Sequence, residues 1–103
     1  MTSPFDATTF DPLDTFAFEA LAVAGTAVGF TAATQANAVA AFCTVEGAPI
    51  RARADGTDPT ATVGIPFNVG DTFVVWGSRD LNAIRFIRQG ASATLSTHFA
   101  KAV

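Results

Sequence analysis

The sequence predicts an all-β fold, an antiparallel β-sandwich or a small barrel of the jelly-roll or immunoglobulin-like kind. Short apolar or alternating runs recur between turn signals at about ten-residue intervals. No stretch shows the period of a long amphipathic helix. Of the 103 residues, 50% are hydrophobic and 15% are charged, which excludes intrinsic disorder of the whole chain. This length suits one core, so we expect a single sandwich domain over residues 16–103 after an extended N-terminal arm, residues 1–15.

The predicted arm contains two prolines, three aspartates and isolated aromatic residues, and it follows neither strand nor helix periodicity. One interpretation is a frayed terminus, the usual fate of such a segment. The other is an arm that docks Phe5 and Phe10 on a neighbouring subunit.

Two strands are expected in the first half of the domain. Residues 16–23 alternate and end before Gly25. Residues 38–46 are apolar on both faces, with Phe42 on one face and Cys43 on the other. This pattern is typical of a central strand covered on both sides, by its own core and by a second subunit. Cys43 is expected to be a buried small hydrophobic residue.

The middle of the chain predicts three more strands. Residues 50–53 place Arg51 and Arg53 on one face. Asp-Gly and Asp-Pro pairs predict a turn or loop at 55–59. Residues 62–67 predict an irregular or edge strand, because Pro66 has no N–H to donate. Residues 72–76 form a strand with Trp76 and Phe73 on opposite faces.

The last part of the chain predicts a helical turn and two strands. Residues 78–82 close one turn with Ser78 as the N-cap. Residues 83–89 favour a strand, although their apolar spacing also fits a short helix. Residues 93–99 place Leu95 and Phe99 opposite His98 and its polar neighbours, so this strand is expected to have one solvent-exposed face.

Catalytic, cofactor and metal signatures are absent from the sequence. The one His, His98, has no acid nearby in the chain, and the one Cys excludes an intrachain disulfide and a cysteine-based zinc cluster. Asp55 and Asp58 offer oxygens to a calcium ion, but the acidic residue of an EF-hand loop does not follow, so capping within a turn is the preferred interpretation. We therefore expect no enzymatic activity, no cofactor and no metal.

The charge distribution argues against nucleic-acid and membrane partners. The formal net charge is -3, which does not suit neutralisation of phosphates. The uncharged stretch 20–45 is long enough to span a bilayer, but glycine and polar residues interrupt it, and the N-terminus lacks the pattern of a secretory signal. The first 19 residues carry only acids and residues 84–103 only bases, which would orient copies in a homo-oligomer if the two ends meet.

The run from Val45 to Thr60, with its string Arg-x-Arg-x-Asp-Gly-Thr-x-Pro-Thr, resembles a group of small β proteins among the structural genes of tailed bacteriophages. Gly64, Gly70-Asp71 and residues 81–88 continue the similarity, and residues 24–31 look like the opening strand and turn of that group. The resemblance covers about residues 16–99 and leaves the arm outside.

This resemblance implies a non-enzymatic virion protein, made in the cytoplasm of a bacterial host. We expect a capsid decoration or cement protein that binds the major capsid protein on the outer shell as a homo-oligomer, a trimer. The alternatives are a tail, fibre or head-tail connector component and, in another class, a carbohydrate-binding β-sandwich, which the absence of Tyr and the single Trp disfavour. The candidate interface residues are two sets, apolar anchors and polar contacts: Phe5, Phe10, Phe42 and Trp76, and Arg51, Arg53, Arg85 and Arg88.

Overall fold

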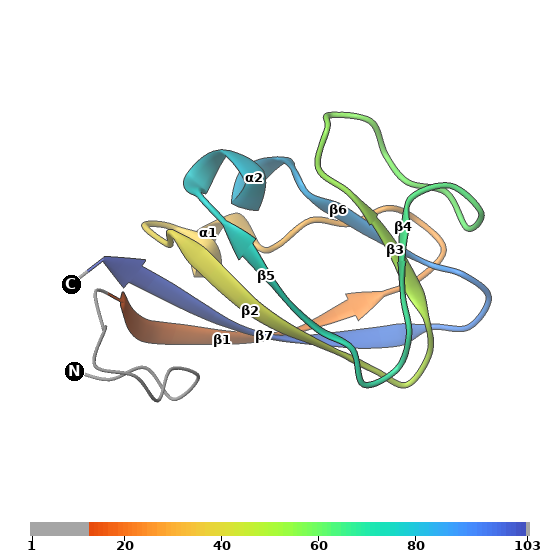
Figure 1. Ribbon diagram of the computed structural model, residues 1–103, viewed down its shortest axis with the longest axis horizontal. Helices are drawn as coiled ribbons and strands as arrows, with labels where there is room; N and C mark the ends of the chain where they lie inside the picture. Colours follow the sequence, from red (N-terminus) through yellow and green to blue (C-terminus); the bar gives the residue numbers. More distant parts are fainter. Residues whose placement is uncertain (1–12, 103) are drawn as a thin grey trace.

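The computed structural model describes residues 13–102 and shows two antiparallel sheets packed against each other (Figure 1). The four-stranded sheet has the order β1-β7-β2-β5, with β1 at Leu13–Val23, β7 at Ala93–Ala102, β2 at Ala40–Glu46 and β5 at Thr72–Trp76. The three-stranded sheet has the order β4-β3-β6, with β4 at Ile65–Phe67, β3 at Ile50–Arg53 and β6 at Arg85–Arg88. The predicted all-β sandwich is confirmed.

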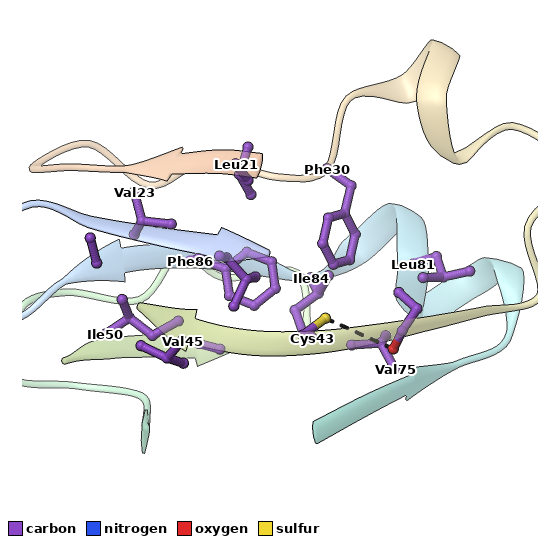
Figure 2. Close-up of a cluster of buried hydrophobic side chains, with 14 of the residues drawn as sticks. Leu21, Val23, Phe30, Cys43, Val45, Ile50, Val75, Leu81, Ile84 and Phe86 are labelled. Carbon is purple, nitrogen blue, oxygen red and sulfur yellow. Dashed lines mark hydrogen bonds between the residues drawn. The ribbon is translucent and has the colours of Figure 1, made fainter. Parts of the chain in front are cut away.

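The core lies between the two sheets and is built from the inward side chains of every second strand residue. Phe86 of β6 and Phe99 of β7 are completely buried. Phe30 lies in the segment between β1 and α1 (Ala32–Gln35), and Figure 2 shows its ring reaching into this cluster. The ring centroid of Phe30 lies 5.2 Å from that of Phe86 and 5.1 Å from that of Phe99. Edge-to-face contacts of this kind add to the hydrophobic stabilisation that joins the sheets.

Two short helices lie at one end of the sandwich. The α2 helix (Ser78–Ala83) includes the predicted helical turn and buries Leu81 in the core (Figure 2). Its N-cap is Gly77 and not Ser78, so the predicted cap was wrong by one residue, and no side chain caps this helix. The α1 helix was not predicted, because four residues without a capping side chain give no periodic signal. A hydrogen bond of 2.7 Å from Gln35 Nε2 to Asn82 Oδ1 links the two helices.

β1 begins at Leu13, inside the predicted arm of residues 1–15. Asp14 pairs with Lys101 and Thr15 with Ala100, so three arm residues belong to the strand. The physical reason is that β7 extends to Ala102 and its backbone groups are satisfied by pairing with β1. Phe5 and Phe10 lie outside the described residues.

The strand predictions from the middle of the chain agree with the structure, except that the strand predicted over 62–67 covers only Ile65–Phe67. β2 lies between β7 and β5 as a central strand, and β4, which contains Pro66, is an edge strand of its sheet. Arg85 to Arg88 form β6, so residues 83–89 contain a strand and not a continuation of the helix. Gly56 adopts a φ of 89°, which agrees with the predicted turn at 55–59.

Gly64 precedes β4 in a conformation that a side chain disfavours. Its φ is 140°, and a Cβ there would lie 3.2 Å from each of three atoms in Ala52, Arg51 and Pro59. We predict that Gly64→Ala lowers the free energy of unfolding by about 1–3 kcal/mol because it adds backbone strain and crowding. Gly90 is the matched control, since its φ is not positive and a Cβ there meets nothing within 4 Å. Gly90→Ala should change stability by less than about 1 kcal/mol. Urea denaturation of both variants checks this, and equal effects would contradict it.

Candidate functional site

The outer face of the four-stranded sheet carries an apolar row. Phe18 of β1, His98 of β7, Phe42 of β2 and Val74 of β5 are register partners, so their side chains line up across the sheet on the face that points away from the core. Phe18 is 56% exposed and Val74 is 41% exposed. The ring centroids of Phe18 and His98 lie 5.2 Å apart in an edge arrangement. We call Phe18, Phe42, Val74, Trp76 and His98 the apolar face.

Trp76 extends this face to the end of β5. Its side chain is 56% exposed, and its ring centroid lies 6.4 Å from that of Phe42. Two predicted apolar anchors, Phe42 and Trp76, are therefore brought together on one surface. An exposed Trp beside a half-buried Phe is the kind of aromatic pair on which a protein partner packs.

The apolar character is confined to one half of the outer face. The next row across the sheet is Ala20, Ser96, Thr44 and Thr72, all small or polar. At the end of β2, Glu46 accepts a 3.0 Å hydrogen bond from the hydroxyl of Ser96. The outer face is thus divided into an apolar half and a hydrophilic half.

His98 shows what the sequence prediction missed on this face. Residues 93–99 alone predict a solvent-exposed face there, yet His98 is half-buried between Phe18 and Phe42. The alternation in residues 16–23 places Phe18 on the face opposite the buried Leu21, and this pattern could have indicated that Phe18 lies on the outer face. No signal in the chain places these strands side by side.

The predicted arginine contacts lie on the other sheet. Arg51 and Arg53 lie on one face of β3, as predicted from their spacing, and the structure shows that this face points away from the core. Arg51 donates hydrogen bonds to the carbonyl oxygens of Ala61, at 3.0 Å, and Gly64, at 2.9 Å. Arg53 forms an ion pair with Asp55, with 2.5 Å between Nη2 and Oδ2. Both arginines therefore brace the loop between β3 and β4.

Arg85 and Arg88 also have partners within the chain. Arg85 donates to the carbonyl oxygens of Asn82 and Ile84, each at 2.8 Å, at the end of α2. Arg88 donates to the Ser92 hydroxyl at 3.1 Å. The structure thus separates the two predicted sets, with the described apolar anchors on one sheet and the arginines on the other.

An open groove runs between the sheets where β4 and β5 lie. Phe67 of β4 and Phe73 of β5 stack with ring centroids 4.2 Å apart and join the two sheets there. A cavity of about 340 Å³ lies beside this stack, with a mostly apolar lining that includes Ala52, Ile65, Val75, Trp76 and Ile84. We call this cavity the edge groove. Ile65 is 62% exposed at its rim, so the core is incompletely covered on this side.

Cys43 and His98 do not form a catalytic pair with each other. Cys43 faces the core and is 2% exposed, whereas the register partner of His98 is the outward Phe42. Burial raises the pKa of the Cys43 thiol from 9.0 to about 12, so the thiol is protonated at neutral pH. Among residues 13–102, no three His, Cys, Asp or Glu side chains cluster as metal ligands would. None of the helices in this range is sufficiently long and apolar to span a bilayer.

Comparisons with known proteins found no matching family model, no similar curated protein and no similar solved structure.

The Arg53–Asp55 pair predicts a pH dependence of loop structure. The hydrogen bond from Arg53 lowers the pKa of Asp55 from 3.8 to about 2. Because the folded-state pKa lies below that of the unfolded chain, the stabilisation is present above about pH 4 and is lost as the pH falls through about 2. We expect an NMR titration of the Asp55 carboxyl to have its midpoint near 2. In Arg53→Gln the midpoint should rise towards 3.8, and an unchanged midpoint would show that the ion pair does not form in solution.

Burial of Cys43 predicts slow reaction with thiol reagents. In the native protein at pH 8, we expect dithionitrobenzoate to label Cys43 only as fast as the domain opens, and labelling in urea to be immediate. The control is Ala20→Cys in a Cys43→Ser background, since position 20 is exposed on the outer face. Absorbance of the released thiolate measures both rates. Equally fast native labelling of the two proteins would contradict the burial.

Proposed function

We propose that this chain is a non-enzymatic structural protein that binds the outer surface of a bacteriophage capsid, as a decoration or cement protein. The observation that carries the proposal is the apolar face. Phe18, Val74 and Trp76 are each more than 40% exposed on one side of a rigid sheet. A contiguous apolar surface of this kind is a feature of interaction sites.

The chemistry of the described residues fits a role in binding. Cys43 and His98 point to opposite faces of the sheet, and neither lines the edge groove, whose charged lining residues are Arg53 and Asp80. A flat sheet face suits contact with a broad protein surface better than capture of a small molecule, which favours a concave pocket.

The phage assignment comes from the resemblance of residues 16–99, and the apolar face gives it a mechanism. At about 25 cal/mol per Å² of apolar surface removed from water, a face with several aromatic residues supplies useful affinity per copy. Many copies on one shell then act together, so each contact is allowed to be weak. In this proposal the apolar face binds the major capsid protein, and the oligomer is a trimer.

The arginines lie on the other sheet, so in this proposal they are candidates for polar contacts to a neighbouring capsid protein and not to the surface under the apolar face. A guanidinium has five N–H donors, and the internal hydrogen bonds of Arg51 use two of them. The remaining donors are available to carboxylates of that neighbouring capsid protein.

The proposal is tested on particles from the source of the sequence. Mass spectrometry of purified virions should find the chain, and a cryo-EM map should place it on the capsid shell. Density at the tail or connector, or absence from the virion, would overturn the decoration role. Specific glycan binding by the isolated protein would instead support a carbohydrate-binding module.

The apolar face is tested by a charge placed on it. Phe18→Lys should weaken co-sedimentation with particles that lack the chain by about tenfold or more, because a buried aromatic contact is replaced by a charge. Ala22→Lys is the matched control, on the same strand and face but in the hydrophilic half, beside Thr94. It should bind like the wild type. Equal binding by the two variants would show that the apolar face is not the contact.

A further inference from the structure

The edge groove lies between two strands with free edges. β4 pairs with β3 alone and β5 with β2 alone among the strands of residues 13–102. A free edge presents unpaired N–H and C=O groups to any extended segment that passes it. Because the groove beside these edges is apolar, the segment that completes it must bring both backbone groups and an apolar side chain.

β5 is apolar on both of its sides. Phe73 and Val75 point towards the core side, and Val74 and Trp76 point to the outer face; at the free edge of β5 all four line the groove. A strand added to the β5 edge would therefore meet apolar surface on both faces. The strand that fits this edge best has one aromatic residue on each face. The residue numbers of the two aromatic residues must then differ by an odd number, because side chains alternate between the faces of a strand.

Residues 1–12 have this composition. Phe5 and Phe10 are five positions apart, so in an extended strand they point to opposite faces. Pro4 and Pro12 bracket seven residues, 5–11, each of which has an N–H to donate. The segment thus offers a short strand with one phenylalanine for each side of β5.

The place where this segment joins the domain points to a neighbouring copy. It precedes Leu13, the first residue of β1, and β1 and β5 are the opposite edges of the four-stranded sheet. Two copies placed edge to edge bring the start of β1 in one beside the β5 edge of the other. Twelve extended residues reach about 40 Å, which is long enough to run along the β5 edge of an adjacent copy.

We propose that residues 5–11 of one copy add as a strand to the β5 edge of a neighbouring copy, with one phenylalanine in the edge groove and the other beside Trp76. Such a contact joins two different edges and is head-to-tail, so its repetition gives a closed ring, such as the proposed trimer, when the rotation between copies closes, and an open filament when it does not. This inference rests on the proposed function, which supplies the homo-oligomer in which copies lie next to each other. The groove carries charges of both signs, Arg53 and Asp80, so apolar contact and backbone pairing hold the strand, and not net charge.

The oligomeric mass of the full chain tests the phenylalanines. Phe5→Ser combined with Phe10→Ser should reduce the mass measured by multi-angle light scattering from that of the oligomer to that of a monomer. Thr8→Ala combined with Thr9→Ala alters the same segment without touching an aromatic residue and should leave the mass unchanged. Retention of the oligomer by the Phe5/Phe10 variant would overturn the inference.

The groove is tested with a second pair of variants. Ile65→Arg introduces a charge at the groove rim, and Val69→Arg introduces the same charge at an exposed aliphatic residue outside the groove lining. We expect only Ile65→Arg to reduce the oligomeric mass. Circular dichroism confirms that both variants are folded, and equal masses would overturn the role of the groove.

Cross-linking locates the segment directly. The full chain carries benzoylphenylalanine at position 10, and ¹⁴N- and ¹⁵N-labelled copies are mixed before illumination. Mass spectrometry should find cross-links of mixed isotope composition to residues 65–67 or 72–76. Cross-links within one copy, or to β1 or β6, would overturn the exchange. If cross-links between copies are absent but the chain still binds particles, this inference alone is rejected. If cross-links between copies form but the chain is absent from virions, the capsid role alone is rejected.

Discussion

The packing of Phe86 between the two sheets is the interaction on which the rest of the structure depends. Its ring meets Phe30 from the segment after β1 and lies 6.2 Å from the ring of Phe73 on β5. The backbone of Phe86 also pairs with that of Val28, so the same residue holds the β1–α1 segment alongside β6. Once Phe86 faces inward, the alternation of each strand determines which side chains face solvent, and the apolar face becomes a consequence of the core.

The sandwich is closed unequally on its two sides. The β1–α1 segment covers the β6 side: the backbones of Val28 and Phe86 exchange two hydrogen bonds, and the Arg88 N–H donates to the carbonyl oxygen of Ala24. On the other side, the Phe67–Phe73 stack joins β4 to β5 and the edge groove lies beside it. The free edges of β4 and β5 therefore lie on the same side of the sandwich as the incompletely covered part of the core. No other described strand or helix covers that side.

The apolar face and the edge groove share β5, and this strand links the two proposed contacts. Trp76 and Val74 belong to the apolar face and also line the edge groove, whereas Phe73 and Val75 belong to the groove alone. The proposed capsid contact also uses Phe18 at the opposite edge of the sheet, so the two contacts meet at Trp76 and differ at Phe18. In these two proposals the β5 edge joins copies to each other and the apolar face binds the capsid shell. Both contacts are apolar, which accounts for the many aromatic and few charged residues of this small chain.

The sequence by itself determined the fold class, the central position of β2, the edge position of the Pro66 strand and the burial of Cys43. These depend on local periodicity and on proline chemistry, which a single strand carries within itself. Only the tertiary structure decided the neighbours: that β7 lies between β1 and β2, so that His98 joins Phe18 and Phe42, and that β1 takes residues 13–15 from the predicted arm. It also decided that Arg85 and Arg88 are engaged within the chain, away from the apolar face. Strand order and register arise from contacts distant in sequence, and periodicity within one strand contains no information about which strand lies beside it.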